Sequence, residues 1–473
     1  TGEFSATEEK GEGAWPLILD EILRLEPSEL LCSSISLVKK CRSGFRESHQ
    51  GLIEDLPYLP DEKESKEEIV AQWGESIFQD LSLGNYPLAA KAAAAALIYL
   101  KNLQQLKERG RHFSALKLYF SKKYMIIDSI TSRNLELTQS IRSGAKQGSL
   151  LSIIDFCSTS MGRRLLRRWL EQPLRQKSAI EKRHDAVEEL LTKALIRRSL
   201  RSNLTAMFDL ERFCSRLALQ RTNARDLVAL KNTLQQLNPI KDLIKTCAAN
   251  YIRELSDKMP NFSDLTELIS KTLLDEAPLA LKEGGLIKPG FNEEVDYLRK
   301  LSSEAKTLLM DYEASEKKKT GIKSLKVGFN RNYGYYIEVT KSNVNLVPEN
   351  YSRKQTLVNA ERYTTEELRQ LEDQITGARD HLAALEYELF EALREQVTLQ
   401  AEQLLVAANY LAVLDCLQAL AEAAERYNYC RPHFNDDNHF NIKQGRHPVV
   451  EQLAFEQFVP NDIVMDNNNF LLV

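Results

Sequence analysis

The sequence lacks several features that would assign it to a common protein class. Its seven cysteines are odd in number and include no Cys-x-x-Cys pair, which argues against a disulfide framework or a zinc ribbon and suits a reducing cytoplasm. It contains no Gly-Lys dipeptide, so no phosphate-binding P-loop is present. No signal peptide is visible at the N-terminus, and the apolar stretch from Ala89 to Leu100 is too short to span a bilayer. We therefore predict a cytoplasmic chain with no membrane partner.

The chain also lacks a strong excess of charge of either sign. It has 63 Lys and Arg against 67 Asp and Glu, which gives a net charge of -4. Binding of nucleic acid through overall charge is thereby excluded, so any such contact must come from a local basic region. The length suggests roughly three domains, and 43% apolar residues suffice for several cores. Because the chain has no initiator Met and stops in the apolar run 470–473, we expect an excised fragment.

Helical patterns are abundant. Residues 1–108 mix helical and strand signals and predict a small α/β domain. From about residue 128 to 285 the pattern is almost wholly helical, with prolines at intervals. The predicted fold class is therefore mainly α and multidomain.

Two later segments carry the repeat of a coiled coil. Apolar or small residues recur at spacings of 3 and 4, which places them on one stripe of each helix. The first stripe contains Val295, Leu298, Ser302, Ala305, Leu309 and Tyr312, and the second contains Leu368, Leu371, Ile375, Ala378, Leu382, Leu385 and Leu389. Helical character then continues to about Arg426, which gives roughly 60 residues, or about 90 Å if unbroken. No compact core can surround such a helix, so we predict an antiparallel coiled-coil arm.

A basic β-segment lies between these two helices. Leu325, Val327 and Phe329 alternate as in a strand, residues 330–334 form a turn, and residues 335–340 resume a strand. Residues 306–365 hold eleven Lys or Arg and six Asp or Glu, an excess of +5 in a chain whose total is -4. A basic sheet at the tip of an arm can reach a polyanion and neutralise its phosphates without reading sequence. The alternative is that the Lys run 317–319 is simply the solvated end of a helix.

Several strings, taken in order, resemble those of bacterial MutS proteins of DNA mismatch repair. They are SRNLELT at 132–138, GSLL at 148–151, MGRRLLRRWL at 161–170, LKVGFN at 325–330 with GYYI at 334–337, QTL at 355–357, NAERY at 359–363 and GRHPVVE at 445–451. Each string alone is moderate evidence, but the ordered set covers nearly the whole chain.

The resemblance implies four regions. Residues 1–108 would be an N-terminally truncated connector domain, 109–305 and 366–429 the lever, 306–365 the clamp, and 430–473 the first strands of a truncated ABC-type ATPase domain. The clamp would grip the DNA backbone without reading sequence, and the lever would couple DNA to the absent ATPase. The full-length parent would bind mismatched double-stranded DNA as a homodimer, contact MutL through its connector, and hydrolyse ATP with Mg. The fragment would need no cofactor and have no catalytic residue, and the protein would act at the bacterial nucleoid.

The resemblance also indicates DNA-binding residues in the clamp. Lys354 and Asn359 occupy positions at which relatives contact the DNA backbone, one as a point charge and the other as an amide donor. Position 358 departs from the family pattern, because many relatives carry a basic residue where this chain has valine. Arg353, Arg331 and Lys341 are further candidates from charge and placement alone.

Two other groups of residues are candidate sites. Phe458 matches a family aromatic residue that stacks on the adenine of the nucleotide, although a phenylalanine more often covers a core. His433 and His439, with Asp436 and Asp437 between them, could ligate a metal. Such a stretch is more often a polar surface loop, so we predict no metal site.

Two rival interpretations stay open at this point. One is a MutS paralogue that works in recombination control or ribosome rescue, against which the connector region argues because some paralogues lack it. The other is a coiled-coil scaffold with no nucleic-acid role, against which the basic clamp argues.

Overall fold

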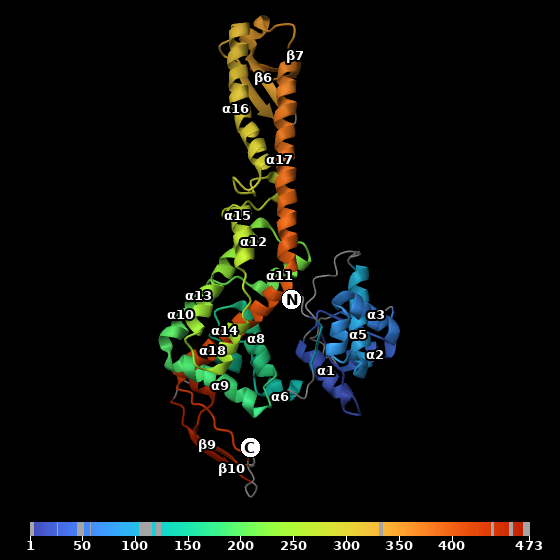
Figure 1. Cartoon of the computed structure of the whole chain (residues 1–473), viewed down its shortest axis with the longest axis vertical. Coiled ribbons are helices and arrows are strands. Elements are labelled where there is room, and N and C mark those ends of the chain that lie inside the picture. The colour runs from blue at the N-terminus through green and yellow to red at the C-terminus, as the bar shows by residue number, and fades with distance from the viewer. Residues whose placement is uncertain are drawn as a thin grey trace. The chain divides into compact units, whose positions relative to one another are not determined.

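A computed structural model describes residues 4–25, 27–44, 52–56, 58–103, 116–119, 124–330, 334–436, 439–453 and 457–466. Helices dominate these residues and strands form only small sheets, so the predicted mainly α, multidomain class is confirmed (Figure 1). The chain divides into two compact units. Unit 1 comprises Thr1–Arg221, Asn232–Phe262 and Thr398–Val473, and unit 2 comprises Thr222–Lys231 and Ser263–Val397. The four domain boundaries predicted from sequence stay predictions.

The N-terminal part of unit 1 mixes strands and helices, as its sequence pattern predicts. Its elements are β1 (Ser5–Ala6), α1 (Ala14–Leu25), β2 (Glu29–Cys32), α2 (Ile35–Gly44), β3 (Leu52–Asp55), α3 (Glu62–Trp73), α4 (Glu75–Asp80), η1 (Leu83–Asn85), α5 (Pro87–Leu103) and β4 (Lys117–Leu118). β2 pairs with β3, and β1 with β4, both in parallel. The buried Glu8 carboxylate accepts hydrogen bonds from Leu88 N (2.9 Å) and Ala89 N (3.1 Å) and so caps the start of α5.

The rest of unit 1 is a helical body built on one central helix, α18 (Ala401–Tyr427). Its helices are α6 (Ser129–Asn134), α7 (Leu150–Ile154), α8 (Ser160–Glu171), α9 (Lys177–Thr192), α10 (Ala194–Thr205), α11 (Leu210–Ala218), α13 (Leu237–Ile244) and α14 (Asn250–Lys258), and α12 (Ala224–Gln235) belongs to both units. α8, α9, α10 and α11 all contact α18. Helix α18 is long and apolar enough to cross a membrane, but 72% of its most apolar window is buried inside the structure. That burial is typical of a core helix.

A buried carboxylate joins α18 to the start of α8. Asp415 is fully buried and accepts hydrogen bonds from Ser158 N (2.9 Å), Thr159 N (2.7 Å) and Thr159 Oγ1 (2.6 Å). Amides at a helix start have no partner within the helix and carry partial positive charge, so a carboxylate satisfies them well. Gly162 makes this approach possible, because a Cβ at that position would lie 2.2 Å from Asp415 Oδ2.

The C-terminal part of unit 1 is a two-stranded antiparallel ribbon. Its elements are β9 (Phe440–Gly445), α19 (Pro448–Leu453) and β10 (Asn461–Met465). Arg446 follows β9 directly and donates hydrogen bonds to Tyr427 O (3.0 Å) and Asn428 O (2.8 Å), at the C-terminal end of α18. A cation at the carbonyl end of a helix is favourable, so this arginine fixes the ribbon to the central helix.

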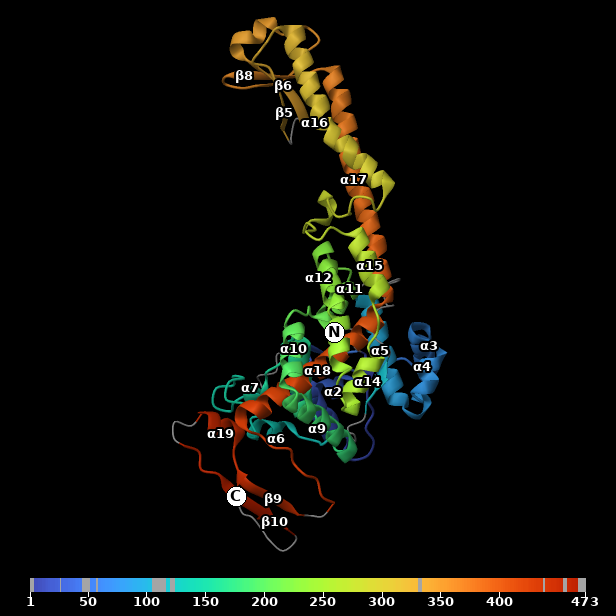
Figure 2. The same ribbon diagram turned by 60° about the vertical axis from the view of Figure 1, so that its left-hand side comes forward.

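Unit 2 contains two long helices side by side, as Figures 1 and 2 both show. α16 (Glu293–Thr320) starts where Asn292 accepts hydrogen bonds from two amides and ends at Gly321, whose φ of 72° is left-handed. α17 (Glu366–Leu399) returns beside it. α15 (Ser263–Thr272) and the 3₁₀ turn η4 (Leu281–Glu283) precede the pair. The predicted two-helix arm is thus present.

The buried stripe of the arm differs in part from the predicted one. Val295, Leu298, Tyr312 and Leu368 are buried as expected. Farther along α17, however, Leu385 and Leu389 are only half-buried. The buried positions there are Glu386, Phe390, Leu393, Arg394 and Val397. The fully buried Glu386 carboxylate accepts hydrogen bonds from Arg299 Nη2 (2.6 Å) and Leu286 N (3.0 Å), which draws that side of the helix inward.

Helical character continues to Tyr427, close to the predicted end near Arg426, but in two helices instead of one unbroken helix. α17 ends at Leu399 and α18 begins at Ala401, with Gln400 between them outside both helices. The two helices also differ in how they are buried. α17 buries one stripe of residues, whereas α18 has buried residues at almost every position from Leu411 to Ala421. The 3-and-4 spacing of apolar residues therefore does not continue from α17 into α18.

A four-stranded antiparallel sheet lies at one end of the α16–α17 pair (Figure 2). Its strands are β5 (Lys326–Asn330), β6 (Gly334–Thr340), β7 (Ser352–Thr356) and β8 (Ala360–Thr364), in the order β5-β6-β8-β7, with the 3₁₀ turn η5 (Lys341–Leu346) after β6. Tyr312 of α16 and Leu368 of α17 share its core with Ile337, Val339 and Tyr363. We call residues 321–365 the clamp sheet.

Candidate nucleic-acid interface

The clamp sheet separates an apolar face from a polar one. Ile337 pairs with Val327 and Tyr363 on neighbouring strands, and these side chains pack toward the two helices. The alternate positions carry Tyr336, Glu338 and Arg362. The Arg362 guanidinium lies 4.0 Å from the centre of the Tyr336 ring and its Nε donates to Glu338 Oε2 at 3.1 Å. The polar face is thus organised by internal contacts of an arginine, rather than by a row of free cations.

Most cations around the sheet have an acidic partner in the structure. The pairs are Lys317–Glu313 (2.5 Å), Lys319–Glu316 (2.8 Å), Arg362–Glu338 (3.1 Å), Arg353–Glu361 (3.8 Å) and Lys354–Glu372 (3.9 Å). Within the described ranges, four exposed lysines have no ion pair: Lys318, Lys323, Lys326 and Lys341. The excess of positive charge found in the sequence is therefore available to an external anion at a few positions only.

The structure places Lys354, one of the two favoured sequence candidates, against α17. Its Nζ lies 3.4 Å from Tyr335 O and 3.9 Å from Glu372 Oε2, and its side chain is 24% exposed. The β7–β8 pairing shifts by one residue between Arg353 and Gln355, so Lys354 is the extra residue of a bulge. A bulge redirects a side chain, which is why strand alternation could not locate this lysine. A phosphate would have to compete with Glu372 for it.

Arg353 and Arg331 complete the candidates near the strands. Arg353 is 63% exposed and its Nη1 is 3.8 Å from Glu361 Oε1, a loose pair that leaves the guanidinium open to solvent. Arg331 lies outside the described residues.

Lys341 and Asn359 are brought together although they are far apart in sequence. Both are exposed, and Lys341 N donates a hydrogen bond to Asn359 O at 3.1 Å. Val358 is 85% exposed beside them. Lys341 therefore supplies positive charge close to an exposed apolar side chain.

The other candidate residues belong to unit 1. Phe458 is partly exposed in the segment before β10. Asp437 lies outside the described residues, and among those that the structure describes, no three His, Cys, Asp or Glu side chains are grouped as a metal site would require.

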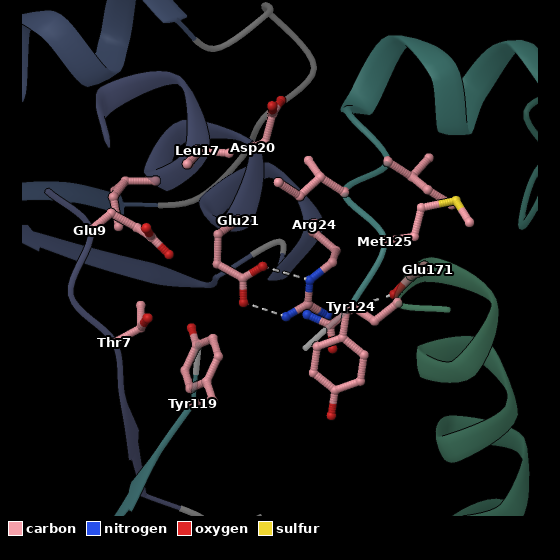
Figure 3. Close-up of a pocket in the computed structure, with 14 residues that line it drawn as sticks. Thr7, Glu9, Leu17, Asp20, Glu21, Arg24, Tyr119, Tyr124, Met125 and Glu171 are labelled. Carbon is pink, nitrogen blue, oxygen red and sulfur yellow. Dashed lines mark hydrogen bonds and ion pairs between the residues drawn. The ribbon is translucent and has the colours of Figure 1, made fainter. Parts of the chain in front are cut away.

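A small cavity in unit 1 was not foreseen from the sequence (Figure 3). Its volume is about 70 Å³, and its lining comes from well-separated segments. Arg24 points toward Glu21, with bonds of 2.8 and 2.5 Å, and its Nη1 is 3.8 Å from Glu171 Oε2. Burial, with the neighbouring Glu21, raises the pKa of the Tyr119 hydroxyl. The cavity holds an internal ion pair and has none of the lysines or glycine-rich backbone of a phosphate site.

Comparison with known proteins identifies the family. Residues 130–421, from α6 to α18 and including the clamp sheet, match the family model of MutS domain III. The chain belongs to the MutS family. The resemblance found in the sequence strings is thereby confirmed, and the mainly helical lever fold agrees with it.

MutS proteins from several bacteria are similar to the chain over its whole length. It is 41% identical to the DNA mismatch repair protein MutS of Caldanaerobacter subterraneus subsp. tengcongensis, over 100% of the chain and 54% of that protein. Identity is 40% with the MutS of Lachnoclostridium phytofermentans (100% and 50%) and 39% with that of Clostridium tetani (100% and 53%). The chain thus spans about half the length of the MutS relatives it matches. Their shared name favours mismatch repair over the paralogue interpretation.

Proposed function

We propose that the chain serves DNA mismatch repair by gripping the backbone of duplex DNA with its clamp sheet. The observation that supports this best is the placement of exposed, unpaired lysines around a sheet at one end of the α16–α17 arm. Lysine neutralises phosphate as a point charge and releases condensed counterions, so the resulting affinity is independent of sequence and falls with salt.

The arm supports a second part of the proposal, the transmission of displacement from DNA to the helical body. α17 is followed by α18 after the single residue Gln400, and the Glu386–Arg299 pair holds α16 and α17 together. At the other end of α18, Arg446 joins the helix to the ribbon that starts with β9. We propose that in a longer protein this ribbon opens the ATPase domain, where Phe458 stacks on the nucleotide.

The remaining parts of the proposal follow from family membership. The protein that contains this chain would bind mismatched DNA as a homodimer, hydrolyse ATP with Mg, and contact MutL through residues 1–108, in the bacterial cytoplasm. The 473 residues themselves contain no Gly-Lys dipeptide, which a P-loop requires.

Binding to a labelled duplex at several salt concentrations tests the clamp proposal. We expect the logarithm of the association constant to fall linearly with the logarithm of salt concentration, with a slope of about -3 if three or four lysines each meet a phosphate. Matched and mismatched duplexes of the same length should bind equally well to this chain. Contacts between lysine and phosphate are strongest at low salt. Absence of binding to the duplex at about 20 mM salt would therefore favour a coiled-coil scaffold with no nucleic-acid role.

A further inference from the structure

Two cysteines in the N-terminal part of unit 1 have their sulfur atoms in contact. Cys32 is the last residue of β2 and Cys41 lies in α2, and the Cys32 thiol donates to Cys41 Sγ at 3.8 Å. Both side chains are buried, and both are free thiols. A disulfide bond has a sulfur–sulfur distance of about 2.05 Å, so the two atoms need to approach by only about 1.8 Å to form one.

The packing of α2 on the strand pair brings the two cysteines together. Leu56 N donates a hydrogen bond to Cys32 O at 2.7 Å, which extends the β2–β3 pairing and fixes the end of β2. The helix starts with a hydrogen bond from Val38 N to Ser34 O (3.0 Å) and contacts both strands. Val38 and Cys41 are three residues apart, so they share the face of α2 that is buried with Cys32. The backbone therefore determines this contact between thiols.

The core that covers the two thiols is small. Its buried members are Cys32, Val38 and Cys41, and the partly buried residues packed against them are Trp15, Leu30, Leu37 and Ile53. Ile35 at the start of α2 and Leu52 at the start of β3 are exposed. A core of this size opens locally at low cost, because few apolar contacts are broken. Such an opening gives a small uncharged reagent access to both sulfur atoms.

A second pair of neighbouring cysteines has less accessible surroundings. Cys157 and Cys416 share the core that joins α7, α8 and α18, and they are 4% and 0% exposed. The Cys416 thiol also donates to Gly162 O at 3.2 Å. Access to these sulfur atoms requires opening of the main helical body, so we expect them to react much more slowly than Cys32 and Cys41.

The protonation of Cys32 makes it a slow nucleophile. Burial and the neighbouring Cys41 thiol raise the pKa of Cys32 to about 11. Because the thiolate is the form that attacks an oxidant, a cysteine that is almost entirely thiol at neutral pH is unsuited to rapid catalytic exchange. The pair is suited instead to a slow reaction whose rate increases with pH.

We propose that Cys32 and Cys41 form a peroxide-responsive modification site, at which oxidation links β2 to α2 by a disulfide bond. The sulfur of one cysteine attacks the O–O bond of hydrogen peroxide, which gives a sulfenic acid and one water. The sulfur of the second cysteine then displaces the hydroxyl group, which takes up the thiol proton and leaves as a second water. Two thiols and one peroxide thus become one disulfide and two waters, and a thiol reductant restores both cysteines by exchange.

This site is independent of the proposed function, because it lies in unit 1 whereas the clamp sheet lies in unit 2. Contact between the two sulfur atoms also predicts the end product. A sulfenic acid that forms on one cysteine meets the other thiol at once, so it condenses to a disulfide before a second peroxide converts it to a sulfinic acid.

Peptide mapping after peroxide treatment tests the site on the full chain. The exposed Cys430 is first replaced by alanine to prevent links between chains, which leaves six of the seven thiols. We expect hydrogen peroxide to remove two of these six thiols, to join the peptides that contain Cys32 and Cys41, and a dithiol reductant to restore both. The rate of oxidation should increase about tenfold from pH 7 to pH 8, because the thiolate fraction does.

Variants of single cysteines separate a paired site from general oxidation. Cys32→Ala and Cys41→Ala should each lose the link, and the cysteine that remains should proceed to a sulfinic acid because no neighbouring thiol captures its sulfenic acid. The control Cys247→Ala also removes a buried thiol, beside Glu189 and Lys193, and should keep the link. In the oxidised chain, amide hydrogen exchange in α2 should be slower by about tenfold or more, because the link restricts the opened state.

The possible results support or overturn the proposal directly. Thiols of Cys32 and Cys41 that do not react while the chain stays folded overturn it, and so does a link from either cysteine to a different one. A sulfinic acid on Cys32 in the chain that retains Cys41 also overturns it, because the two sulfur atoms would then not be in contact. Circular dichroism checks the fold of the alanine variants, and the mapping with only Cys430 replaced does not depend on them.

Discussion

Replacing Gly162 with alanine should destabilise unit 1 strongly, although alanine is the better helix former. Gly162 lies in the first turn of α8, and a Cβ there would sit 2.2 Å from Asp415 Oδ2, 2.7 Å from Cγ and 2.8 Å from Cβ. None of these atoms is the end of a flexible side chain in open space, because Asp415 is fully buried. The Asp415 carboxylate must therefore move away from the backbone amides of Ser158 and Thr159, which now donate hydrogen bonds to it.

The size of the effect follows from these contacts. Two charge-assisted hydrogen bonds are worth about 1.5–3 kcal/mol each, so their loss costs roughly 3–6 kcal/mol. Alanine returns about 1 kcal/mol through helix propensity. The free energy of unfolding should thus fall by about 2–5 kcal/mol, which moves the urea midpoint of unit 1 down by roughly 1 M or more. Fluorescence of Trp169, on the same helix, reports the transition.

A second glycine provides a matched control of opposite sign. Gly377 lies inside α17 and a Cβ there would meet no atom within 4 Å, so Gly377→Ala should stabilise unit 2 by up to about 1 kcal/mol. The reasoning is refuted if Gly162→Ala unfolds at the same or higher urea concentration than the parent chain, since the carboxylate could not then occupy the position that the structure gives it.

Two further predictions concern buried and paired carboxylates of unit 2. Glu386→Gln should lower the free energy of unfolding by about 3 kcal/mol because it leaves the Arg299 charge without its buried partner. The control is the exposed Glu294, whose Oε1 lies 3.9 Å from His381 Nε2: Glu294→Gln should change the free energy of unfolding by less than about 0.5 kcal/mol. Equal effects of the two substitutions in urea unfolding would contradict this prediction. Hydrogen bonds from Lys231 and Lys288 hold the pKa of Asp275 below its usual value. Such a group stabilises the fold above its unfolded pKa of about 3.9 and loses that contribution as pH falls through the lower folded value. The urea midpoint should therefore decrease below about pH 4, and it should decrease less in Asp275→Asn; an identical pH profile would show that the lysines do not stabilise the carboxylate.

Local sequence signals located the long elements of unit 2 well. The spacing of apolar residues located α16 and its partner helix, and the structure shows that Asn292 and Gly321 cap the two ends of α16. The buried stripe of α17 differs from the predicted one because the Glu386 carboxylate is buried, where it accepts a hydrogen bond from Leu286 N, 100 residues away. No periodicity of apolar residues can register a charged side chain that is buried by partners so distant in sequence.

The candidate interface was predicted in outline but not in its choice of side chains. Counting charges over residues 306–365 gave Lys354 and Lys323 the same weight, whereas the structure pairs the first with Glu372 and leaves the second exposed. Lys341 and Asn359 become neighbours through the β6–β8 register, in which Thr340 lies opposite Ala360. Register depends on packing of the whole sheet, so their proximity could not be read from either strand alone.

The amino-acid sequence by itself determined the family, the mainly helical class, and the succession of helix, basic sheet and helix, because periodicity and ordered motifs are properties of neighbouring residues. The tertiary structure alone decided which carboxylates are buried and which lysines remain open to an anion. The reason is that ion pairs form between residues distant in the chain, and a bulge of one residue suffices to turn a side chain toward a carboxylate instead of solvent.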